Sequence, residues 1–147
     1  MSVSLQDWLK NGWLVEHQTS RKEIADLLGM ADRDLVQCQT PHLSADWQLS
    51  IAYNAALQAA IAALAGAGYR AAREAHHYRA IQSLAYTIKA DARLIAQLDK
   101  FRKKRNISDY ERAGAVSEQE AKEMFVLARN LKKEVEKWLH SNHPELL

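Results

Sequence analysis

Residues 51–69, "IAYNAALQAAIAALAGAGY", form the most apolar stretch of the chain and decide its fold. Tyr53 and Leu57 stand one helical turn apart, and alanine, the residue with the highest helix propensity, fills most of the other positions. A helix that is apolar nearly all round belongs in the middle of a bundle. Because Asn54 and Gln58 interrupt the apolar run, we expect a buried helix here and no membrane span.

The rest of the chain also shows helical periodicity, and no stretch alternates between apolar and polar residues over a useful length. We therefore predict an all-α fold, an up-and-down, antiparallel bundle of four to five helices. The expected elements begin with a short opening helix ended by Gly12, a helix from Ser20 to near Pro41 and a helix over residues 44–64. A helical segment from His76 follows, which either restarts at Asp91 or bends and continues into the basic residues near 105. A last helix runs from Ser117 and ends before Pro144.

Two of these helices begin with the sequence of a capping box, in which two residues three apart bond each other's backbone N–H. "SRKE" would pair Ser20 with Glu23, and "SEQE" would pair Ser117 with Glu120. The glycines of "AGAGYR" are expected to stop the central alanine-rich helix.

Composition limits the class of protein. The chain has 147 residues, which suits one domain, with residues 1–18 as a short helical extension and 141–147 as a tail. Lys and Arg number 20 against 18 Asp and Glu, so any anion-binding site must be local. The one cysteine, Cys38, cannot form an internal disulfide, and the first residues lack the pattern of a signal peptide. We expect a cytoplasmic protein that does not enter a membrane.

A second stretch, "DKFRKKRNISDYER" at residues 99–112, carries five cations within six positions. On a helix, Arg105 continues the apolar line of Leu98 and Phe101, whereas Lys103 and Lys104 project around other faces. Arg105 is therefore expected to point toward a core edge or an interface. A buried guanidinium must be paired or face a polar cavity, because a lone buried charge is costly.

The candidate binding residues are gathered around this arginine. They are Arg105, Asn106, Tyr110, Arg102, Lys103, Lys104 and Asp109. Together they bring guanidinium, amide, carboxylate and phenol groups to the end of one helix. The simpler alternative stays open: charge runs at helix ends are usually solvated, and Arg105 with Asp109 has the spacing of an ordinary i,i+4 ion pair.

"KFRKKRNISDY", followed by "SEQEAKEMFVLARNLKKEVEKWL", resembles the C-terminal half of a HEPN domain, the higher-eukaryote-and-prokaryote nucleotide-binding family. The alanine-rich stretch and "HHYRAIQSL" are also similar to family members, and the resemblance covers residues 20–140. It implies a HEPN-like bundle that forms a homodimer, with the motif helices meeting across the two-fold axis. It also implies a possible nucleotidyltransferase or antitoxin partner, as in toxin–antitoxin modules.

The ribonuclease members of this family carry Arg, four to six residues and then His. Here Arg105 and Asn106 match, but Tyr110 stands where the histidine would be. The reference pKa of tyrosine, about 10, makes it a poor base at neutral pH, although it can donate a hydrogen bond to phosphate or stack on a nucleobase. The resemblance thus implies a nucleotide- or RNA-binding protein with a degenerate ribonuclease motif, and argues against an enzyme.

Two other functions stay open. One is a protein–protein adaptor for a nucleotidyltransferase or antitoxin that binds no nucleic acid. The other is an active, metal-independent ribonuclease, with His76 or His77 approaching the motif from another helix as the base.

Other chemistry finds little support in the sequence. His140 and His143 have a spacing that can share a metal ion, but no further ligand stands near them. Cys38 lies on an apolar helix face, where a packed thiol is the default. We expect no metal and no cofactor. Arg70, Arg73 and Arg79 flank the glycine turn and would extend a basic patch.

Overall fold

The computed structural model describes residues 4–110 and 114–147, with the backbone alone at 107–110. The chain is mostly helical, which confirms the all-α prediction in its broad form. The helices are α1 (Leu5–Lys10), α2 (Arg21–Gln37), α3 (Ala45–Gly66), α4 (His76–Gln82), α5 (Ala92–Tyr110) and α6 (Glu118–Asn142), with 3₁₀ turns η1 (Ser83–Ala85) and η2 (Pro144–Leu146).

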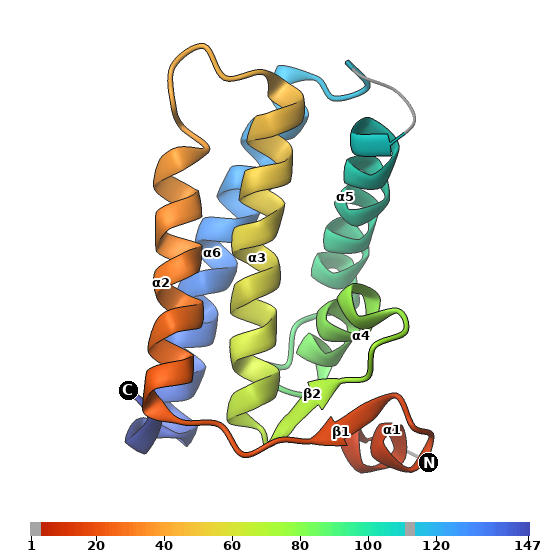
Figure 1. Ribbon diagram of the computed structural model, residues 1–147, viewed down its shortest axis with the longest axis vertical. Coiled ribbons are helices and arrows are strands. Elements are labelled where there is room, and N and C mark those ends of the chain that lie inside the picture. Colours follow the sequence, from red (N-terminus) through yellow and green to blue (C-terminus); the bar gives the residue numbers. More distant parts are fainter. Residues whose placement is uncertain (1–3, 111–113) are drawn as a thin grey trace.

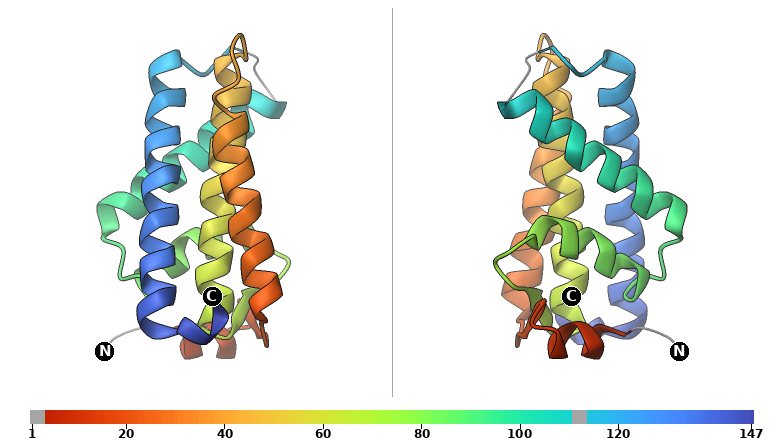
Figure 2. Two further views of the ribbon diagram at one scale, coloured as in Figure 1. Left: turned by 90° about the vertical axis from the view of Figure 1, so that its left-hand side faces the viewer. Right: turned by 90° about the vertical axis from the view of Figure 1, so that its right-hand side faces the viewer.

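The long helices α2, α3 and α6, together with the oblique α5, alternate in direction along the chain (Figure 1). The alanine-rich α3 lies in the middle, as its sequence predicts, with α2 and α6 on one side and α4 and α5 on the other. Helix α5 crosses the long helices obliquely rather than lying along them (Figure 2). The result is one face of α3 covered by two long helices and one covered by a short helix and an oblique one.

The core follows the predicted helical stripes. Tyr53, Leu49 and the α3 alanines are buried, as are Met124 and Val135 of α6 and Ile24 of α2. By length and composition α3 could cross a membrane, but 78% of its most apolar window is buried within the bundle. That is the pattern of a core helix in a soluble protein.

The predicted helix starts are largely found. Ser117 and Glu120 form the expected capping box of α6. Of the two alternatives for the segment from His76, the restart is correct: α4 ends early, and the Asp91 carboxylate accepts a hydrogen bond from the backbone N–H of Leu94 at the start of α5.

The capping box predicted at Ser20 is only half formed. Ser20 accepts a hydrogen bond from the Glu23 backbone at 3.1 Å. The Glu23 carboxylate does not return the bond, because it is held instead by His17 at 2.6 Å and Thr19 at 2.7 Å.

A small two-stranded sheet was not predicted. Strand β1 (Leu14–Glu16) pairs antiparallel with β2 (Tyr69–Ala71), so that Val15 lies opposite Arg70. Three-residue strands are too short to show an alternating pattern. The sheet binds the N-terminal segment to the end of α3, and α1, the sheet and η2 all lie at that end of the bundle (Figure 1).

Candidate functional site

The cations of α5 differ in what they contact. Arg102 donates to Asp99 at 2.7 Å, and the Lys103 ammonium lies 3.4 Å from the same carboxylate. Lys104 reaches across to Glu120 at the start of α6, with 3.6 Å between nitrogen and oxygen. Lys103 is largely exposed, whereas only 21% of the Arg102 side chain is exposed. The cationic run is therefore not a uniform solvated face.

Arg105 turns inward, as its place on the apolar line of α5 predicts. Its guanidinium carbon lies 5.3 Å from the centre of the Tyr53 ring on α3, within the range of a cation–π contact. Its Nε atom is buried. The cation closes the apolar seam between α3 and α5 instead of extending into solvent.

Tyr53 lies beneath this guanidinium and is fully buried. Its hydroxyl forms no hydrogen bond within the described part of the chain. Burial raises the pKa of Tyr53 to about 12, although the nearby Arg105 and Arg102 charges act in the opposite direction. At neutral pH the phenol is therefore protonated, and it presents a donor where three helices meet.

Helix α4 brings His77 to the same place. The rings of His77 and Tyr53 have centres 6.4 Å apart, and His76 packs edge-on against His77 at 4.2 Å. Burial, then the neighbouring His76, then Arg105 and Arg102 lower the pKa of His77. The imidazole is thus held neutral at pH 7, beside two guanidinium groups.

Tyr78, the next residue of α4, covers the outer part of the group. The guanidinium carbon of Arg102 lies 5.4 Å from the centre of the Tyr78 ring. We call Tyr53, His77, Arg102 and Arg105 the α4–α5 cluster. It collects two guanidiniums, a neutral imidazole and a buried phenol from three helices.

The predicted site residues separate into three groups. Arg102 and Arg105 come together in the cluster, and Lys103 and Lys104 lie at its edge. Asn106 is exposed near the end of α5. The side chains of Asp109 and Tyr110 lie outside the described residues, so their placement in a site stays a prediction.

The predicted binding residues did not include His77, Tyr53 or Asp99, although Asp99 opens the basic stretch. Asp99 stands three residues before Arg102, a spacing that signals an ion pair on a helix. Tyr53 is an aromatic residue on an otherwise alanine-rich helix. In the sequence, only its position at the start of a helix pointed to His77. For that reason His77 was considered, with His76, as a base that approaches the motif from another helix.

The chemistry of the cluster suits an anion. Planar guanidinium groups bind phosphate and carboxylate oxygens through paired N–H donors. Because Arg102 already has a carboxylate partner and Arg105 is held against an aromatic ring, both are pre-oriented. A neutral imidazole next to bound phosphate can accept a proton.

Metal chemistry has no comparable group. Among the described residues, no three His, Cys, Asp or Glu side chains approach closely enough to share an ion. His143 lies beside Trp138, with ring centres 5.1 Å apart.

Cys38 is buried and donates a hydrogen bond to the Leu35 carbonyl. Burial, followed by the charge of Asp34, raises the pKa of Cys38 to about 11. This thiol is a packing group.

Comparison with protein-family models, with curated proteins and with solved structures finds no match to the chain. The geometry of the site, together with the sequence resemblance, is what bears on function.

Proposed function

We propose that the chain is a HEPN-like, cytoplasmic protein that binds RNA or a nucleotide phosphate at the α4–α5 cluster. The observation that carries the proposal is the position of Arg105. Its guanidinium is held on the Tyr53 ring, and His77 from α4 lies next to the same ring. An arginine that served only to keep the helix end in solution would not be turned inward onto a core aromatic residue.

The electrostatics favour a bound phosphate. Burial is the main cause of the lowered pKa of His77, followed by His76, and Arg105 and Arg102 act in the same direction, so the imidazole lies in the positive potential of the two guanidiniums. A phosphate placed there would gain from both cations in a partly desolvated site, where charge-assisted hydrogen bonds are strong. The exposed Lys103 would add affinity from the rim, in a salt-dependent way.

The direct test is binding of a fluorescently labelled single-stranded RNA, measured by anisotropy. Arg105→Ala is expected to weaken binding about tenfold, the value of one charge-assisted hydrogen-bonded contact. Arg93→Ala is the matched control, because Arg93 is exposed in the first turn of the same helix. Equal isotherms for Arg105→Ala and the wild type, with the fold intact by circular dichroism, would remove the proposal.

The resemblance also leads us to propose a homodimer and a nucleotidyltransferase or antitoxin partner. Sedimentation of the pure chain tests the dimer. Capture of partner proteins at physiological salt, with and without nuclease, tests the second part. Retention of a protein partner that ignores nuclease, together with no RNA binding in solution, would favour the adaptor instead.

A second candidate function, metal-independent RNA cleavage, is favoured by one observation. His77 takes a position beside Arg102 and Arg105, and its lowered pKa leaves it neutral and able to act as a base. In this reaction the imidazole removes the proton of a 2'-hydroxyl, and that oxygen attacks the adjacent phosphorus. The 5'-oxygen leaves and takes up a proton, which gives a 2',3'-cyclic phosphate. The arginines would stabilise the charge that develops on the phosphate.

Cleavage is tested by incubating the pure chain with mixed RNA in EDTA and analysing the product ends. We expect 2',3'-cyclic phosphate ends that disappear in His77→Gln and in Arg105→Ala. His76→Gln is the matched control, because His76 is the exposed neighbour of His77. Intact RNA with the wild type, in a preparation that binds RNA, would exclude this second function and leave the first.

A further inference from the structure

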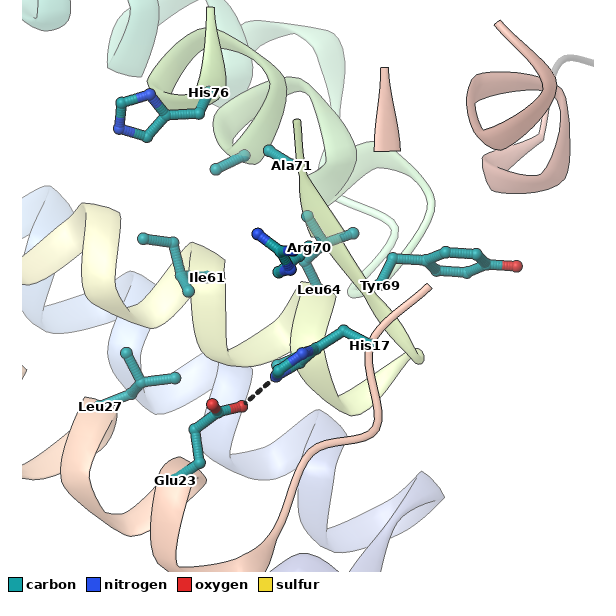
Figure 3. A pocket seen from close by; sticks show the side chains of 11 residues that line it. His17, Glu23, Leu27, Ile61, Leu64, Tyr69, Arg70, Ala71 and His76 are labelled. Carbon is teal, nitrogen blue, oxygen red and sulfur yellow. Dashed lines mark hydrogen bonds and ion pairs between the residues drawn. The ribbon is translucent and has the colours of Figure 1, made fainter. Parts of the chain in front are cut away.

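A cavity of about 220 Å³ lies on the other side of the start of α4, between the small sheet and the bundle (Figure 3). Its apolar wall comes from Leu27 of α2, from Ile61 and Leu64 of α3, and from Ala80 of α4. Leu27 and Ile61 are only partly buried, although they stand on the inner faces of long helices. The cavity thus keeps apolar surface in contact with solvent within the fold.

The carboxylate at the rim of the cavity, that of Glu23, already has two hydrogen-bond partners. Glu23 accepts hydrogen bonds from His17 and Thr19, both from the segment that follows β1. The hydrogen bond from Thr19, and then that from His17, lower the pKa of Glu23 although its partial burial acts in the opposite direction. Glu23 is therefore ionised at neutral pH, and its hydrogen bonds to His17 and Thr19 hold the N-terminal segment against α2.

Arg70 brings a positive charge to the rim of the cavity. It lines the cavity from β2, and no ion pair to it occurs within residues 4–110 or 114–147 as described. Figure 3 shows its guanidinium on the cavity side of β2, whereas the Tyr69 ring points away. The rim therefore offers one guanidinium without a described ion pair next to an aliphatic wall, while the Glu23 carboxylate is engaged by His17 and Thr19.

We infer that this cavity binds a small aliphatic molecule with an anionic head group. Concave apolar sites with a few convergent polar groups are the usual form of small-molecule sites. The volume is below the roughly 300–1,000 Å³ of sites for drug-sized ligands, so a short chain fits. The apolar wall is aliphatic, because the Tyr69 ring is turned outward and the two histidines of the lining, His17 and His76, lie among its polar residues. The head group would be met by Arg70 and the chain would cover Ile61 and Leu64.

This site is separate from the α4–α5 cluster, and neither proposal depends on the other. His76 lines the cavity, and the next residue, His77, belongs to the cluster. Adjacent helical residues point about 100° apart, so one helix end serves both places.

The test is an NMR titration of the isotopically labelled full chain with hexanoate, and with hexanamide as the uncharged control. Shifts are expected at the amides of Ile61, Leu64 and Ala71, with hexanamide binding about fivefold more weakly, the value of a partly exposed ion pair. Arg70→Gln should weaken hexanoate binding by the same factor and leave hexanamide unchanged. Arg93→Gln is the control for loss of an exposed arginine.

Ile61→Phe, which fills the cavity, is expected to abolish the shifts with both probes. Its own spectrum must stay dispersed, which shows that the bundle has folded. No saturable shift at the cavity with millimolar hexanoate would overturn the inference. So would equal affinities of the wild type and Arg70→Gln for hexanoate.

Discussion

The two faces of helix α3 differ in how they treat polar groups. Toward α2 and α6 the apolar core includes Ile24, Met124 and Val135, and the buried Asp34 and Lys132 of that side are paired. Asn54 donates to the buried Asp34 at 2.6 Å, and Lys132 of α6 lies 2.9 Å from Glu136 and also pairs with Asp32. Toward α4 and α5, the Tyr53 hydroxyl is buried with no hydrogen bond inside the described ranges, beneath Arg105 and next to His77.

This difference separates stability from function within one helix. Buried polar groups that are fully paired add rigidity and specify one packing. A buried polar group without a partner costs free energy, so its presence in a cluster of titratable side chains marks a site. We therefore expect substitutions on the α2–α6 side to change the free energy of unfolding, and those on the α4–α5 side to change binding.

The largest effect is expected for Met124→Ala in α6, on the α2–α6 side. Met124 is fully buried, and its truncation leaves a cavity that costs about 2–5 kcal/mol of the free energy of unfolding. Urea denaturation measures this. Val36→Ala is the control, since Val36 is 72% exposed and should change stability by less than about 0.5 kcal/mol. If the core variant and Val36→Ala changed the free energy of unfolding by similarly small amounts, packing on the α2–α6 side would not be what stabilises the fold.

A smaller loss is expected for Asn54→Leu. The substitution removes the 2.6 Å donor to Asp34 and leaves a buried carboxylate with only its weaker contacts to Arg33, at 3.3 Å. The cost should be about 1–3 kcal/mol by thermal or urea denaturation. Gln58→Leu, one turn further along α3, is the matched control and is expected to be near neutral. If Asn54→Leu were also neutral, the pairing on this side would carry no stability.

The opposite sign is expected for Tyr53→Phe. Because the hydroxyl is buried without a described partner, its removal should leave the free energy of unfolding unchanged or raise it by up to about 1 kcal/mol. The ring that carries Arg105 is retained. A loss greater than about 1 kcal/mol in the same urea assay would show that the hydroxyl is paired, and would erase the contrast between the two faces.

The sequence predicted the long helices well, because each carries a strong apolar stripe and several start with a side chain that caps them. It also predicted the inward direction of Arg105, since position on a helix follows from spacing alone. It missed the strand pair, whose three-residue strands show no alternation. It also assigned the Glu23 carboxylate to the helix cap, whereas His17 arrives through the sheet and takes it.

The site was only half predictable for a similar reason. Residues 102–105 can be recognised from the sequence alone, because they form a basic run within one helix. His77 joins them only because α4 ends after two turns and α5 restarts at Asp91 and crosses back over α3. Such a juxtaposition depends on tertiary packing, which no local pattern encodes.

The most direct test of the central claim, that the α4–α5 cluster holds phosphate, is the pKa of His77 followed by NMR with and without 5'-AMP. Burial and the neighbouring positive groups lower the pKa of His77 in the free chain. A phosphate bound between Arg102 and Arg105 would favour the protonated imidazole, so the pKa should rise toward and beyond its usual value near about 6.5 in the wild type. It should not move in Arg105→Ala. A His77 pKa that stays the same at saturating 5'-AMP would contradict the account.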